Sequence, residues 1–76
     1  MENLKTIAMK ALDANPVVLE RIQSAPATGQ YKAVGSALAS AVARRAGVDI
    51  NRATWALVNA ANFKFYEVGD EINVDF

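Results

Sequence analysis

The sequence predicts a mainly α-helical fold, a small bundle of about four short helices followed by a C-terminal β-hairpin. The helices are predicted because apolar residues recur at three- and four-residue spacing, with Pro and Gly between the segments. The hairpin is predicted because apolar and polar residues alternate on both sides of a Gly-containing turn near the C-terminus. With 76 residues, the chain is expected to form one small domain, residues 1–76.

The first two helices are predicted on either side of the segment "DANP". The first covers about residues 2–14, and its apolar stripe consists of Leu4, Ile7, Ala8, Ala11 and Leu12. Asn15 suits a helix N-cap and Pro16 suits the first helical position, so a second helix is expected from Pro16 to about Ser24. Pro26 should end it, because the residue before a proline disfavours the α conformation.

A long third helix is predicted over about residues 29–46, with Thr28 as its cap. Its apolar stripe consists of Tyr31, Val34, Leu38 and Val42. A neighbouring face carries small residues four positions apart, namely Gly35, Ala39 and Ala43. Small residues let another backbone approach, so this face is expected to pack within the chain, and a homodimer seam is the alternative.

A tight turn and a fourth helix are predicted next. Gly47 favours the left-handed conformation that ends a helix, and Asp49 suits the next N-cap. The helix should cover about residues 50–62, with Ile50, Ala53, Leu57 and Ala61 on one side. The opposite side carries Asn51, Arg52, Trp55, Asn59 and Asn62.

The segment "NFKFYEVGDEINVDF" alternates with a period of two, as expected for a hairpin. Phe63 and Phe65 would share one face of the first strand. In the second strand the apolar residues are Ile72, Val74 and Phe76, and the polar ones are Glu71, Asn73 and Asp75. An isolated hairpin is barely stable in water, so this one is expected to pack on the helices.

Composition argues against an enzyme, a metal site and a cofactor. The chain has no Cys and no His, which removes thiolate and His-activated nucleophiles and the usual zinc ligands. It also shows no Gly-rich phosphate loop. No run approaches the roughly 18 apolar residues of a membrane span and no secretory signal is recognisable, so a cytoplasmic location without membrane contact is expected.

The net charge is zero, but its distribution is uneven. Residues 30–62 carry four basic residues against one acidic, whereas residues 63–76 carry one basic residue against four acidic. This pattern predicts local attraction to phosphate or to an acidic protein, not the uniformly positive field of a dedicated nucleic-acid binder.

The segment "VARRAGV", residues 42–48, resembles the front half of a helix-turn-helix. Small or buried residues stand where that family has them, at Ala43, Gly47, Val48, Ala53 and Leu57. The likeness covers about twenty residues, and a following hairpin is typical of winged-helix domains. "VARRAGVDINRATWAL" and "GDEINV" are also similar to HU-type histone-like proteins, although the intervening length differs and residues 1–30 have no counterpart there.

The helix-turn-helix resemblance implies that the helix at residues 50–62 lies in the DNA major groove. The residues facing the DNA would be Asn51, Arg52, Trp55 and Asn59. Arg44 and Arg45 would hold backbone phosphates, which positions a protein on DNA without reading its sequence.

A protein–protein module is the competing hypothesis. Acidic residues in the hairpin would repel phosphates, and tryptophan is enriched in interface hot spots. The contact surface would then be Trp55, Glu67, Asp70 and Glu71. The sequence therefore predicts a small non-catalytic binding module and leaves two hypotheses open. One is a helix-turn-helix-like DNA-binding or regulatory protein. The other is an interaction protein, such as a small phage or virion component or an inhibitor of a host protein.

Overall fold

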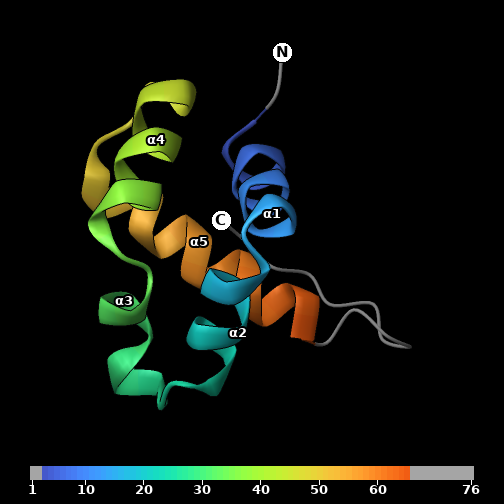
Figure 1. The fold of residues 1–76 in the computed structure, drawn as a ribbon. Helices are drawn as coiled ribbons and strands as arrows, with labels where there is room; N and C mark the ends of the chain where they lie inside the picture. The colour runs from blue at the N-terminus through green and yellow to red at the C-terminus, as the bar shows by residue number, and fades with distance from the viewer. Residues whose placement is uncertain (1–2, 66–76) are drawn as a thin grey trace.

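The computed structural model describes residues 3–65, which confirm the mainly helical prediction (Figure 1). These residues form five α-helices and one short 3-10 helix. The elements are α1 (Leu4–Ala14), α2 (Pro16–Ser24), η1 (Ala27–Gly29), α3 (Gln30–Ala33), α4 (Ser36–Ala46) and α5 (Ile50–Phe65).

Helix α5 is the centre of the bundle. It crosses the middle of the molecule and contacts each of the other four helices (Figure 1). The largest fully buried side chains come from all parts of the described chain and are Leu12, Ile22, Val34, Val42 and Leu57. The described helices therefore share one hydrophobic core.

Alanine makes this close arrangement around α5 possible. Ala53, Ala56, Ala60 and Ala61 are each at most 3% exposed, and short side chains let neighbouring helices approach closely. The buried Thr54 hydroxyl donates a 2.7 Å hydrogen bond to the Ile50 carbonyl, so its polar group is satisfied within the helix. The buried side of α5 thus faces the other helices, while Ile50, Asn51, Arg52 and Trp55 are exposed.

Helix α2 begins and ends where the sequence predicts, but Asn15 acts differently from the expected side-chain cap. Its side-chain amide donates to the Ala11 carbonyl at 2.7 Å, while its own carbonyl accepts from the Val18 and Leu19 amides. Asn15 thus closes the end of α1 with its side chain and begins α2 with its backbone.

The prediction of one long helix over residues 29–46 is wrong, because the chain breaks at Gly35. Two helices, α3 and α4, take its place. Gly35 has φ 84° and ψ 141°, a conformation that is not helical and that residues with a Cβ avoid. Thr28 lies inside η1 and caps no helix. Ala39 and Ala43 are buried within the chain, as predicted, but Gly35 is exposed.

The predicted turn between residues 46 and 50 is confirmed. Gly47 is left-handed, with φ 71° and ψ 34°, and its amide donates to the Ala43 carbonyl at 2.9 Å. The Asp49 carboxylate accepts a hydrogen bond from the Arg52 amide at 2.8 Å, as an N-cap does.

The predicted hairpin is not supported. Helix α5 continues through residues 63–65, where the first strand was expected, and residues 3–65 contain no strand. A period of two over only "FKF" does not oppose a helix already nucleated upstream, since adding a residue to a helix is easy. The Lys5 ammonium lies 4.6 Å from the centre of the Phe63 ring, which ties this last turn to α1. The rest of the predicted hairpin lies outside the described residues.

Candidate functional site

The exposed face of α5 carries four of the six residues predicted to contact DNA. Asn51, Trp55 and Asn59 follow one another at four-residue spacing, and Arg52 lies beside them. Asn51, Arg52 and Trp55 are exposed, and Asn59 is half-buried. The structure therefore brings these four side chains onto one face, the Trp55 face.

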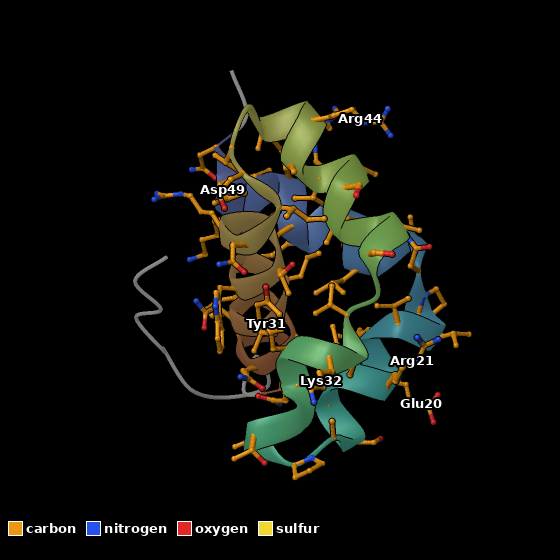
Figure 2. All side chains as sticks on the ribbon, turned by 90° about the vertical axis from the view of Figure 1, so that its left-hand side faces the viewer. Glu20, Arg21, Tyr31, Lys32, Arg44 and Asp49 are labelled. Atoms are coloured by element: carbon orange, nitrogen blue, oxygen red, sulfur yellow. The ribbon has the colours of Figure 1, made fainter. Side chains whose placement is uncertain are left out.

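The centre of the Trp55 face is an aromatic pair. Trp55 is 52% exposed, and its ring lies 5.1 Å from the Tyr31 ring at an interplanar angle of 51°. The Tyr31 hydroxyl also donates a hydrogen bond to the Asn51 side-chain oxygen. Tyr31 reaches α5 from α3 (Figure 2) and so orients both Trp55 and Asn51.

A small pocket of about 150 Å³ lies next to Trp55. It is lined by Leu4, Arg52, Trp55, Ala56 and Asn59. Leu4 supplies the α1 wall and the other residues come from α5, so an apolar side chain of a partner could enter between the two helices. Arg52 places a positive charge at the same pocket.

Asn62 does not belong to the Trp55 face. The helix pattern predicts that it is exposed, but it is half-buried. Its amide pairs with the Gln30 amide in both directions, at 2.9 Å and 3.3 Å. Gln30 also donates to the Ile22 carbonyl at 3.2 Å, and Gln23 donates to the Ala61 carbonyl at 3.1 Å. These bonds join α2, α3 and α5, so the Asn62 side chain helps to hold these helices together.

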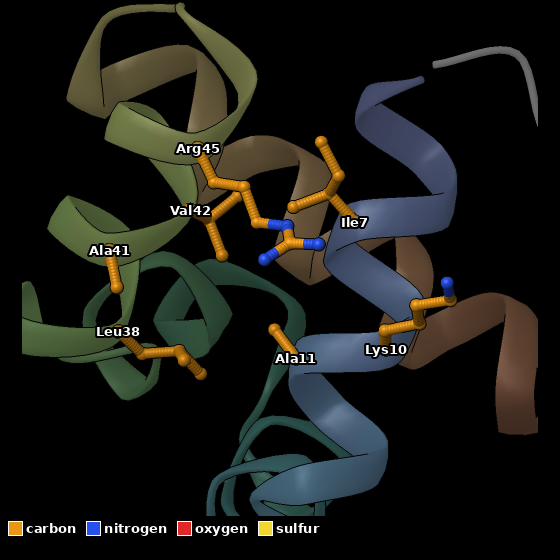
Figure 3. A pocket seen from close by; sticks show the side chains of 7 residues that line it. All are labelled: Ile7, Lys10, Ala11, Leu38, Ala41, Val42 and Arg45. Carbon is orange, nitrogen blue, oxygen red and sulfur yellow. The ribbon is translucent and has the colours of Figure 1, made fainter. Parts of the chain in front are cut away.

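Arg44 and Arg45 do not join the Trp55 face. Both lie in the last turn of α4, where cations interact favourably with the helix dipole. Arg45 extends towards Ile7 on α1 (Figure 3), and Arg44 extends to the opposite side from Asp49 in Figure 2. Arg44 and Arg45 thus belong to α4, whereas the four predicted reading residues lie on α5.

Sequence reasoning missed the role of Tyr31, which it assigned to an apolar stripe. No local signal identifies its contact with Trp55, because the two residues come together only when α3 packs on α5. The acidic residues of the alternative surface, Glu67, Asp70 and Glu71, lie outside the described residues.

The described part of the chain is positively charged. All eight Lys and Arg residues lie within residues 3–65, but only three of the eight acidic residues do, namely Asp13, Glu20 and Asp49. The whole chain has a net charge of zero, so this count describes an uneven distribution of charge along the sequence. None of the helices in residues 3–65 is long and apolar enough to span a membrane.

Comparison with known proteins identified no similar protein. No protein-family model matches the chain, and no curated protein or solved structure is significantly similar to it.

Proposed function

We propose that this chain is a small non-catalytic binding module that docks to another protein through the Trp55 face. The observation that carries the proposal is the half-exposed Trp55 ring, oriented by Tyr31 beside a pocket. A large aromatic side chain that is already oriented loses little conformational entropy on binding, which favours affinity. Tryptophan is also the residue type most typical of interface hot spots, together with tyrosine and arginine.

Charge favours an acidic partner surface. Arg52 lines the Trp55 pocket, and the surrounding helices carry more basic than acidic residues. A partner that places an apolar side chain against Trp55 and a carboxylate near Arg52 would satisfy both features.

DNA binding through the same face is the second candidate, favoured by one specific observation. Arg52 and the amides Asn51 and Asn59 share the exposed face, and these are side-chain types that contact guanine and adenine edges. Three features count against it: the Tyr31 hydrogen bond occupies the Asn51 side-chain oxygen, Arg45 turns towards α1, and four helices pack around α5.

A capture experiment tests the protein-docking proposal. The full chain, immobilised, is compared with Trp55→Ala and with the matched control Val17→Ala, which removes an exposed apolar side chain from α2. Loss of a hot spot costs about 2 kcal/mol or more, so a partner held by the native chain should bind Trp55→Ala about 30-fold more weakly. Val17→Ala should retain it. Equal retention by both variants would contradict docking through Trp55.

A fluorescence titration separates the two candidates. The chain contains a single tryptophan, so its emission reports locally on the disputed face during titration with mixed-sequence duplex DNA. Protein docking predicts a flat trace, even at low salt where non-specific DNA binders respond. A saturable change that disappears as salt rises, and that weakens in Arg52→Ala, would instead assign the face to DNA.

A further inference from the structure

The groove between α1 and α4 is a second feature of the surface, and the proposed function does not use it (Figure 3). Its volume is about 330 Å³, and none of its lining residues belongs to the Trp55 pocket. The buried side chains of Ile7 and Val42 form part of its apolar lining. Ala11 and Ala41 face each other across it, and their short side chains leave the space open.

The groove has a cationic part and an apolar part. Five of its seven lining residues are apolar, and the other two are the cations Lys10 and Arg45. The Arg45 guanidinium extends from α4 towards Ile7, whereas Leu38 lies two turns away along α4 (Figure 3). Seven residues of helix separate Arg45 from Leu38, which corresponds to about 10 Å at 1.5 Å per residue.

We propose that this groove binds an anionic amphiphile of the fatty-acid class. The carboxylate would lie beside the Arg45 guanidinium, which extends into the groove in Figure 3, because a positive charge attracts a carboxylate. The Lys10 ammonium points away from Arg45 in the same view and adds its charge from a greater distance. The alkyl chain would follow Leu38, Ala41 and Ala11. Lys10 and Arg45 each have another interaction within the chain, so they offer the ligand their positive charge and not an empty hydrogen-bonding position.

Size selects this occupant over an acidic protein segment. The volume lies at the lower end of the range for small-ligand sites, roughly 300–1,000 Å³, and suits one medium-length alkyl chain. A stable protein interface buries roughly 1,000 Å² or more in total, which a groove lined by seven residues does not supply by itself.

The test is a nuclear magnetic resonance titration of the labelled full chain with decanoate, kept below its micelle concentration. Saturable shifts are expected at the amides of Ala11, Leu38, Ala41 and Arg45, while the Trp55 indole N–H stays in place. Each buried CH₂ should tighten binding about fourfold, so octanoate should bind up to about 15-fold more weakly. Decyltrimethylammonium has a comparable alkyl chain with the opposite charge, and it should not compete.

Two pairs of variants locate the site. Arg45→Gln removes the positive charge beside the proposed carboxylate and should weaken decanoate binding up to about fivefold, the value expected for one exposed ion pair. The matched change Arg44→Gln removes the neighbouring arginine, which does not line the groove, and should leave binding unchanged. Ala41→Leu fills the groove and should abolish binding, whereas Ala37→Leu, one turn earlier on α4, should not.

Several results would overturn the proposal. Absence of saturable shifts at the groove amides excludes a fatty-acid site, and an acidic amphipathic peptide that produces such shifts instead assigns the groove to a protein segment. Equal effects of Arg44→Gln and Arg45→Gln, or competition by decyltrimethylammonium, would show that the carboxylate is not recognised. Shifts centred on the Trp55 indole would place the ligand on the other face.

Discussion

Replacing Gly35 tests the main departure of the structure from the sequence pattern. A Cβ added at Gly35 would meet no atom within 4 Å, so crowding contributes nothing to the cost of Gly35→Ala. The cost is in the backbone, because φ 84° with ψ 141° is a conformation that only glycine adopts readily. Such strain is of order 1–3 kcal/mol, offset by about 0.4–1 kcal/mol from the reduced freedom of the unfolded chain.

The expected net loss for Gly35→Ala is therefore about 1–2 kcal/mol in the free energy of unfolding. For a domain of this size, that corresponds to a fall of roughly 4–16 °C in Tm. Urea unfolding followed by far-UV circular dichroism measures both the stability and the helix content.

Gly47 supplies the matched control, because it has positive φ in the ordinary left-handed region and equally open surroundings. Asparagine tolerates that region better than alanine does, so Gly47→Asn should be more stable than Gly47→Ala. At Gly35, asparagine should be no better than alanine. If Gly35→Ala is instead as stable as the native chain and gains helix content, residues 29–46 can form one continuous helix and the reasoning from Gly35 is refuted.

Two further predictions concern the core and the polar bonds that support it. Leu57→Ala should lower the free energy of unfolding by about 2–5 kcal/mol, because Leu57 is fully buried at the centre of α5. The same urea assay should show less than about 0.5 kcal/mol for Val17→Ala, which is 68% exposed, and comparable losses would contradict the assigned core. A double-mutant cycle of Gln30→Ala and Asn62→Ala should give a coupling energy of about 1 kcal/mol. A coupling near zero would mean that this amide pair does not help to hold α3 on α5.

Helix boundaries set by local chemistry could be predicted from the sequence. Pro16, Gly47 and Asp49 each determine a boundary through their own backbone preference or a hydrogen bond a few residues away. Such effects depend little on the rest of the fold. The start of α2 and the turn between α4 and α5 were therefore predicted correctly.

Features decided by packing could not be predicted in the same way. Gly35 lies within an apolar pattern compatible with one long helix, but the chain breaks there, and α3 and α4 contact α5 as two separate helices. The alternation that predicts a strand begins at Phe63 and Phe65, where α5 instead continues; over these residues alone the pattern fits a helix equally well. Asn62 looked solvent-facing because its partner Gln30 is 32 positions away.

The candidate site also has a part that could be predicted from local sequence and a part that depends on packing. A helical pattern was enough to place Asn51, Arg52, Trp55 and Asn59 on one face, because residues on one helix have a known angular spacing. The same pattern could not place Arg44 and Arg45 relative to that face, because their position depends on the angle between α4 and α5. Whether the Trp55 face binds protein or DNA stays a prediction that the experiments above decide.

The alanines of α5 connect the stability of the fold to its proposed docking surface. Because Ala53, Ala56, Ala60 and Ala61 are short and buried, the surrounding helices approach α5 closely and cover most of its surface. Trp55 lies on the remaining strip, on a helix held from several sides and beside the ring of Tyr31. A side chain on such a support has few alternative positions, so a partner would meet Trp55 already close to its bound orientation. The small residues that allow the core to close are thus also what would make the exposed tryptophan an effective anchor.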